Sequence, residues 1–309
     1  MGKKFQSGPG NLGNGSLVQS HDPAKKQGGP QLRKGRQVRR CEPLLLFASC
    51  ILLLPLTQFA APTVYEPFSY SNGSNLAGKA GGIGFAGSWT TSSAVDGSIV
   101  SPGQLSYGQL GTAGGNLTAG VGLQVQVDRP LAANLGGVGT TTFVSVLYRP
   151  DAVNSAQDAG LRLMGSKGNT FFGKGSTVGY IDGTHYMINA NGSQGASSIT
   201  ASSGTAVLLV LRADFGNGAS TFKLFVNPTL GSEPNLADAT ASGDIGTVSG
   251  IEFSSSLGAS IDEIRIGGTY ADVASAVPER NTIVAGFAMA FLVVASSLKH
   301  RLEDRTARE

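Results

Sequence analysis

Apolar and polar residues alternate along short stretches in the middle of the chain, and clusters of turn-forming residues separate these stretches. In residues 123–128, Leu123, Val125 and Val127 fall on one side of an extended chain, and polar residues fall on the other. Successive side chains of a strand point to opposite faces, so this pattern predicts a half-buried strand. Stretches with the helical period are scarce in the same region, which favours an all-β fold.

Other stretches are apolar on both sides and predict strands in the centre of a sheet. Residues 143–148 and 206–211 are of this kind. A turn at 214–218 follows the second of them, and the alternation after the turn predicts a hairpin over residues 206–226. Further short apolar stretches predict strands at 186–188, 251–253 and 261–266.

Glycine-rich stretches lie between the predicted strands, and we interpret them as turns and loops. They cover residues 73–87, 111–122 and 164–183. Many short strands joined by such turns predict a sandwich of two antiparallel sheets, most economically a jelly roll. We expect this to be one domain over residues 62–273, which is long enough to bury a core of its own.

Two longer apolar stretches stand apart from the strand pattern, one near each end of the chain. Residues 1–61 form a long basic leader whose apolar core, residues 44–56, precedes small residues, as in a secretory signal helix. Residues 282–298 carry no charge and are just long enough for a transmembrane helix. A linker, residues 274–281, precedes this segment, and a basic tail, residues 299–309, would stay in the cytoplasm.

The net charge of +3 comes from the two ends of the chain and not from the predicted domain. Residues 1–61 carry a net charge of +7 and residues 279–309 carry +1, whereas residues 62–278 carry −5. A mildly acidic domain without a basic run argues against nucleic acid as a partner. Both cysteines, Cys41 and Cys50, lie in the leader, so the exported part would have no disulfide and no thiolate chemistry.

The C-terminal part of the chain resembles a known sorting signal. Val277, Pro278 and Glu279 precede the apolar segment, and basic residues follow it. This order resembles the PEP-CTERM signal of bacteria, which has a Pro-Glu-Pro-like motif and is recognised by an exosortase-type enzyme. The resemblance implies an exported protein at the outer surface, held in the membrane at least transiently. Arg280 replaces the second proline, and an ordinary transmembrane anchor is the alternative.

Three motifs within the predicted domain resemble a group of PEP-CTERM surface proteins that carry a concanavalin A-like (LamG-like) domain. They are Tyr65-Glu66-Pro67-Phe68 near the start, Leu209-Val210-Leu211-Arg212-Ala213-Asp214 in the middle and Ile261-Asp262-Glu263-Ile264-Arg265-Ile266 near the end. The resemblance implies a concanavalin A-like jelly roll displayed outside the cell. It implies no established activity.

Candidate catalytic residues are few in this domain, and on this basis we predict that the chain is not an enzyme. His185 is the domain's single histidine and has the setting of a polar residue at a strand edge. Asp262 and Glu263 are adjacent and would point to opposite faces of a strand, so they could not flank a sugar as glycosidase carboxylates do. We expect Glu263 to form an ion pair with Arg265 on the outer face, with the alternate isoleucines in the core.

Aromatic residues are the candidate glycan contacts, because exposed rings can stack on sugar faces. The candidates are Trp89, Tyr180 and Tyr186. A place in the core is the alternative for Trp89. No cofactor is expected, and calcium is the alternative because it takes several oxygen ligands. Its carboxylates would be Asp151, Asp158 and Asp182.

The sequence therefore predicts a secreted or cell-surface protein of the bacterial envelope that is not an enzyme and that binds extracellular polysaccharide in a lectin-like way or acts in adhesion. Two alternatives remain open. One is a polysaccharide hydrolase or lyase on the same jelly-roll fold, which would shorten glycan chains. The other is a purely structural envelope or biofilm component, which would associate with itself without sugar specificity.

Overall fold

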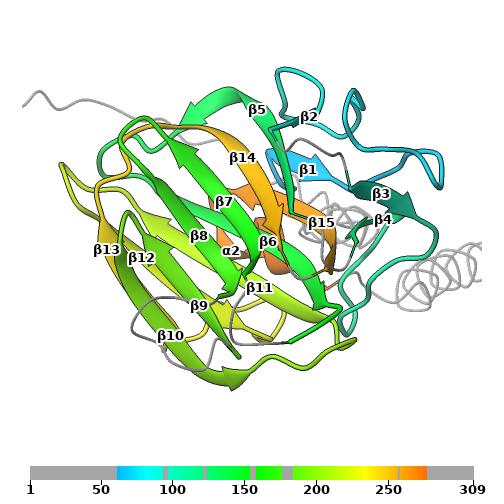
Figure 1. The fold of residues 1–309 in the computed structure, drawn as a ribbon. Coiled ribbons are helices and arrows are strands. Elements are labelled where there is room, and N and C mark those ends of the chain that lie inside the picture. The colour runs from blue at the N-terminus through cyan, green and yellow to red at the C-terminus, as the bar shows by residue number, and fades with distance from the viewer. Residues whose placement is uncertain are drawn as a thin grey trace, which may run out of the picture. The chain divides into compact units, whose positions relative to one another are not determined.

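The strands form two antiparallel sheets that pack face to face, as the two layers of arrows in the ribbon show (Figure 1). The computed structural model describes residues 61–92, 97–120, 124–153, 158–175, 184–256 and 258–276. This architecture confirms the predicted all-β sandwich of two antiparallel sheets, which is jelly-roll-like.

The predicted flanking helices do not gain support from the structure. Their apolar segments, residues 44–56 and 282–298, lie outside the described residues, as do Val277, Pro278 and Glu279 of the sorting motif. Within the described ranges, none of the helices has the length and apolar character needed to cross a membrane.

The first sheet has eight strands within the described part of the chain. They are β1 (Val64–Glu66), β3 (Ser98–Ser101), β4 (Asn116–Ala119), β6 (Thr141–Pro150), β11 (Val207–Asp214), β12 (Ser220–Val226), β13 (Ala239–Gly243) and β15 (Ala259–Gly267). Their order is β13-β12-β11-β6-β15-β4-β3, and β1 also pairs with β15.

The second sheet has seven strands within the same ranges. They are β2 (Thr90–Thr91), β5 (Val125–Leu135), β7 (Ala159–Gly165), β8 (Asn169–Lys174), β9 (His185–Ala190), β10 (Ser193–Thr200) and β14 (Val248–Ser255). Their order is β10-β9-β8-β7-β14-β5-β2, so strands far apart in the sequence become neighbours.

The edge strands β10 and β13, one from each sheet, lie against each other along one side of the sandwich. The backbone N–H of Ser242 donates to the hydroxyl of Ser193 across this seam, at 3.3 Å. A Cβ atom added to Gly195 would lie 2.1 Å from the carbonyl oxygen of Thr240, so the two backbones pack too closely for a side chain.

The main core fills the space between the two sheets. Strand β5 contributes Val125 and Val127, both fully buried, as the alternating pattern predicts. Strand β6 is buried on both faces, because the main core covers one face and a second apolar cluster covers the other. The predicted hairpin is β11 with β12, in which Leu211 pairs with Leu224.

A second apolar cluster covers the outer face of the eight-stranded sheet. Helix α2 (Tyr270–Ala274) begins after a capping box in which Thr269 and Asp272 each accept a backbone hydrogen bond from the other. Tyr270 of this helix packs edge-on against Phe143 and Phe225, with ring centres 6.0 Å and 6.5 Å apart. The apolar residues of β6 and β11 are therefore buried on both faces, in the main core on one side and in this second cluster on the other.

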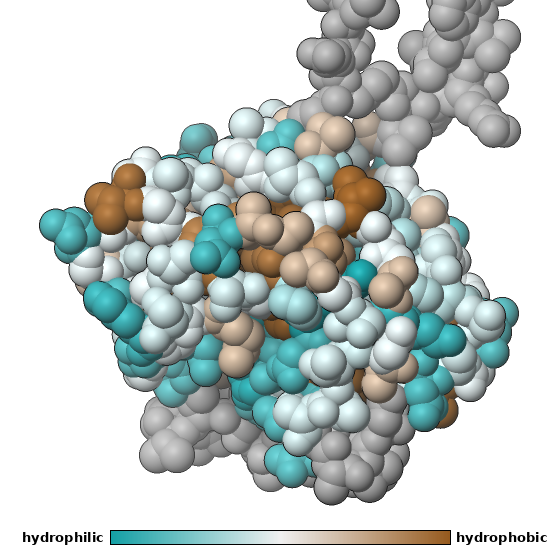
Figure 2. All heavy atoms as spheres, turned by 90° about the horizontal axis from the view of Figure 1, so that it is seen from above, coloured by the Kyte–Doolittle hydropathy of each residue, from teal (hydrophilic) through white to brown (hydrophobic). Residues whose placement is uncertain are grey.

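Most of the described surface seen from above is hydrophilic or neutral, and apolar residues occur there in small groups (Figure 2). Among the residues that the structure describes, the large apolar side chains that stay exposed are Ile83, Ile99, Val138, Val153 and Leu236.

Strands β4 and β8 fall in glycine-rich stretches that are predicted to be loops. The prediction is wrong for these two strands. Glycine has a different purpose in β8, where Gly173 lies directly opposite Gly160 of β7. A Cβ atom on either glycine would lie 2.4 Å from a carbonyl oxygen of the facing strand. These glycines therefore allow close approach of two backbones rather than a turn.

The alternation predicted for β15 breaks at Asp262 and Glu263. The register shifts between Asp262 and Arg265, and Glu263 has a φ of 54° at this irregularity. The predicted ion pair between Glu263 and Arg265 forms, at 2.6 Å, and the flanking Ile264 and Ile266 are buried as expected. Both carboxyl groups are fully buried, however, and bind loop backbone: Asp262 accepts from the N–H of Leu105 at 3.0 Å.

Candidate functional site

A row of side chains crosses the outer face of the seven-stranded sheet, with one residue from each of five neighbouring strands. Asp128 of β5 lies opposite Glu252 of β14, and Glu252 lies opposite Arg162 of β7. Arg162 lies opposite Phe171 of β8, and Phe171 lies opposite Asn189 of β9. The apolar neighbours along these strands belong to the core, so the five side chains point away from it. We call this set the transverse row.

Two carboxyl groups lie side by side in the transverse row and have different surroundings. Glu252 is only 5% exposed, whereas Asp128 is half-buried. Burial raises the pKa of the Glu252 carboxyl, the guanidinium of Arg162 acts against this shift, and the carboxylate of Asp128 adds to it. The pair therefore combines a buried carboxyl group, whose pKa lies above its ordinary value, with a more exposed neighbour.

Arg162 occupies the centre of the transverse row. Its Nη1 atom donates to Oε1 of Glu252, and its Nη2 atom lies 3.8 Å from a carboxylate oxygen of Asp158. The guanidinium is also 5.6 Å from the ring centre of Phe171, within the range of a cation–π contact. These contacts hold the guanidinium between two acids and an aromatic ring.

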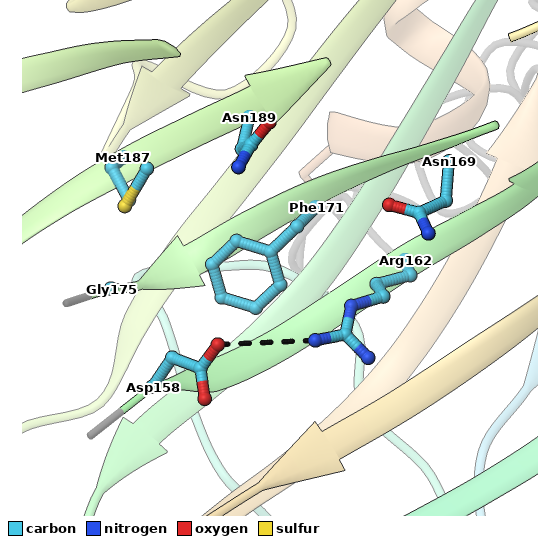
Figure 3. Close-up of a pocket in the computed structure, with 7 residues that line it drawn as sticks. All are labelled: Asp158, Arg162, Asn169, Phe171, Gly175, Met187 and Asn189. Atoms are coloured by element: carbon cyan, nitrogen blue, oxygen red, sulfur yellow. Dashed lines mark ion pairs between the residues drawn. The ribbon is translucent and has the colours of Figure 1, made fainter. Parts of the chain in front are cut away.

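The surface is hollowed on each side of the Arg162–Glu252 ion pair. One hollow, of about 130 Å³, is lined by Asp158, Arg162, Asn169, Phe171, Gly175, Met187 and Asn189. Figure 3 shows Asp158 and Arg162 facing each other at its lower side, with the Phe171 ring above them. The other hollow, of about 460 Å³, is lined by Ser92, Asp128, Arg129, Pro130, Met164, Ser249, Gly250, Ile251 and Glu252. Acidic, amide and aromatic groups thus line the two hollows.

The predicted aromatic contacts are not part of this surface. Trp89 is 1% exposed and donates from Nε1 to Glu66 at 3.1 Å, so its ring lies in the core and does not face the surface. Tyr186 is also 1% exposed and packs edge-on against Tyr148, so it cannot stack on a ligand at the surface. Tyr180 lies outside the described residues.

The other candidate residues are dispersed. His185 is the first residue of β9 and half-buried, which agrees with its interpretation as a strand-edge residue. Asp151 lies 3.4 Å from Arg149, while Asp158 pairs with Arg162, and Asp182 lies outside the described residues. In the described ranges, three or more potential metal-binding side chains do not come together anywhere.

The carboxyl pair was not predicted from the sequence, because acids were sought along one strand. Glu252 stands between the buried Ile251 and Phe253, and Asp128 stands between the buried Val127 and Arg129, a pattern that marks an outward polar residue. Which outward residues become neighbours depends on the pairing of β5 with β14, and the two strands are more than a hundred residues apart in the sequence. The alternation of apolar and polar residues within each strand does not predict which strands pair with each other.

Comparisons with known proteins give a likeness of fold. No family model matches the chain, and no curated protein matches it. Among solved structures, a glycosyl hydrolase family 16 protein from Mycobacterium smegmatis str. MC2 155 is 10% identical with a TM-score of 0.37, covering 67% of this chain and 100% of that one. A β-1,3-glucanase from Mycobacterium marinum is 11% identical with a TM-score of 0.36, covering 68% and 100%.

The carbohydrate-binding module CBM66 from Bacillus subtilis is 10% identical with a TM-score of 0.33, covering 62% of this chain and 96% of that one. At these identities the likeness concerns the fold alone, a jelly-roll-like sandwich. The prediction that the chain is not an enzyme is contradicted: glycosyl hydrolase family proteins are among the structures of similar fold, so this fold does not exclude an enzyme. Its basis was also too narrow, since acids from two strands can meet across a sheet, as Asp128 and Glu252 do.

Proposed function

We propose that this protein binds a polysaccharide along the transverse row and cleaves its glycosidic bonds there. The observation that carries the proposal is the cross-strand pair of Asp128 and Glu252 at the surface hollow. Glycoside hydrolysis requires one carboxyl group that keeps its proton and a second that is ionised. Several of the similar structures are proteins that cleave or bind carbohydrate, and within this proposal we extend that ligand class to the present chain.

The two carboxyl groups take different roles. Glu252, whose pKa is raised by burial, donates its proton to the oxygen of the bond that breaks. Asp128 attacks the anomeric carbon, and the resulting ester is hydrolysed by a water molecule that gives its proton back to Glu252. Residues directly opposite in an antiparallel pair have Cβ atoms about 4.5–5.5 Å apart. The two carboxyl groups are within hydrogen-bond reach of each other, which is much closer than the separation of about 6.5–9.5 Å in inverting enzymes, so we expect retention of configuration.

The remaining residues of the site bind the glycan and orient the acid. Arg162 holds the carboxyl of Glu252 in place from the neighbouring strand. The Phe171 ring and the side-chain amides of Asn169 and Asn189 line the smaller hollow, where they offer apolar contact and hydrogen bonds to a sugar. Arg162 is therefore a positioning residue, and the smaller hollow is a binding site for a flanking sugar.

We also propose that the protein works outside the cytoplasm. The support is the sequence of the leader, residues 1–61, and the resemblance of Val277, Pro278 and Glu279 to a sorting motif. An exosortase-type enzyme would be the partner in this step, and the membrane would hold the C-terminal segment at least until sorting.

The full chain incubated with a panel of polysaccharides should produce new reducing ends from at least one of them. We expect Glu252→Gln and Asp128→Asn each to lower the rate by about a hundredfold or more, the usual contribution of one general acid or base. Reducing-end assays give the rate, and proton NMR of the first product gives its anomeric configuration.

Glu233→Gln is the matched control, because Glu233 pairs with Arg212 on the other sheet. Its rate should equal that of the wild-type protein. Folded wild-type protein that leaves every glycan at its original length would contradict the proposed cleavage, as would full activity in both carboxyl variants.

A further inference from the structure

We infer that the glycan bound at the transverse row carries positively charged amino sugars and not uronic acids. This inference rests on the proposed function and adds the substrate class. The inference rests on the charge in each of the two hollows. That charge depends on which of the lining residues are already paired with an opposite charge.

The larger hollow contains two carboxyl groups and one guanidinium, and the guanidinium is already neutralised. Arg129 is 3% exposed and pairs with the fully buried Glu66. It also donates to the carbonyl oxygens of Gly81 and Gly87, at 2.6 Å and 3.0 Å. Its charge therefore faces the interior of the protein and does not attract a ligand.

The smaller hollow contains one guanidinium, which lies between two acids. Arg162 pairs with Glu252 through Nη1 and lies 3.8 Å from Asp158 through Nη2. An anionic sugar would have to displace the Asp158 carboxylate or lie beside it, and Nη1 of Arg162 is already occupied by the carboxyl group of Glu252. A uronate bound along the row would therefore be repelled, because like charges held together in a hollow are unfavourable.

Asp128 carries the charge that these pairs leave without compensation. Across the described part of the chain, it has no lysine or arginine within ion-pair distance, and it is half-buried beside Glu252. Clefts with low-dielectric walls strengthen the field of such a charge. A sugar ammonium group supplies one positive charge and three hydrogen-bond donors, which matches the acceptor-only oxygens of a carboxylate.

The experiment compares three oligosaccharides of equal length: glucosamine, N-acetylglucosamine and galacturonic acid oligomers. Binding to the full chain is measured by titration calorimetry at a pH where the sugar amines are protonated, in low and in high NaCl. Mass spectrometry after each titration checks that the oligomers have kept their length. At low salt we expect the glucosamine oligomer to bind about fivefold more tightly than its acetylated form, the size of one partly screened charge pair.

High salt should remove this difference, because screening acts on the charge and not on the sugar ring. Asp128→Asn should also remove it, whereas Glu233→Gln on the other sheet should leave it intact. The galacturonate oligomer should show no binding at either salt concentration.

Equal binding of the two glucosamine forms, or preferential binding of galacturonate, would overturn the inferred substrate class and leave a glycan-binding function in place. A preference for glucosamine that survives Asp128→Asn would overturn the assignment to this site. Failure of every neutral and charged glycan to bind or to be cleaved would instead overturn the proposed function itself.

Discussion

At the scale of single residues, Glu66 organises the segment that precedes β2. Its carboxylate accepts hydrogen bonds from the N–H of Phe68, the hydroxyl of Tyr70 and Nε1 of Trp89, at 2.9 Å, 2.7 Å and 3.1 Å. It also forms an ion pair with Arg129, whose guanidinium stacks 3.9 Å from the ring centre of Phe85. One buried acid thus joins four groups from the start of the domain to β5, next to Asp128.

Glu66→Ala should lower the free energy of unfolding by about 3–5 kcal/mol, because it leaves the buried guanidinium of Arg129 without its counter-charge. Urea denaturation of the two proteins measures the difference. The exposed pair of Lys167 and Asp244 provides a comparison, and Lys167→Ala should change stability by less than about 1 kcal/mol. Similar effects for the two substitutions would show that the Glu66 network does not stabilise the fold.

At the scale of elements, the sequence predicts strands well where burial alone defines them. The half-buried β5 and the doubly buried β6 and β11 follow directly from the order of apolar residues. Strand β8 does not, because its glycines resemble turn residues until the facing strand is known. The candidate site was missed for the same kind of reason, since Asp128 and Glu252 become neighbours only through the pairing of distant strands.

Gly173→Ala should destabilise the fold by about 1–3 kcal/mol, the usual effect of adding a methyl group to a closely packed position. The added Cβ would meet the carbonyl oxygen of Ala159, so β8 would have to move away from β7. Thermal unfolding followed by circular dichroism measures the effect. Gly268→Ala is the control, because a Cβ there has no atom within 4 Å, and we expect a change within about 0.5 kcal/mol. Equal stability of both variants would show that β8 has room for side chains at this point.

At the scale of the whole molecule, we propose separate purposes for the sandwich and for the apolar segments of the sequence outside it. The fold supplies the outer sheet face that carries the transverse row, and the sequence of the two ends predicts export. Net charge follows the same division, because the positive charge belongs to the ends and the domain is acidic. This agrees with the inference that the domain selects against acidic glycans.

Protein recovered from its native envelope should have lost the residues beyond about 278–280 if the C-terminal segment acts as a sorting signal. Mass spectrometry of the C-terminal peptide tests this prediction. A chain that still ends at Glu309 would instead indicate an ordinary transmembrane anchor.

The seam between β10 and β13 has a consequence for how copies of this protein behave when they are crowded together. A bare edge strand exposes unpaired N–H and C=O groups and can recruit a strand from another molecule, which leads to aggregation. Here each of these two edges covers the other, with Gly195 packed against the backbone at Thr240. A strand from a neighbouring copy would have to displace the opposite edge before it could pair along this side, so growth of sheets from one copy into the next is disfavoured there when the protein is crowded on a surface.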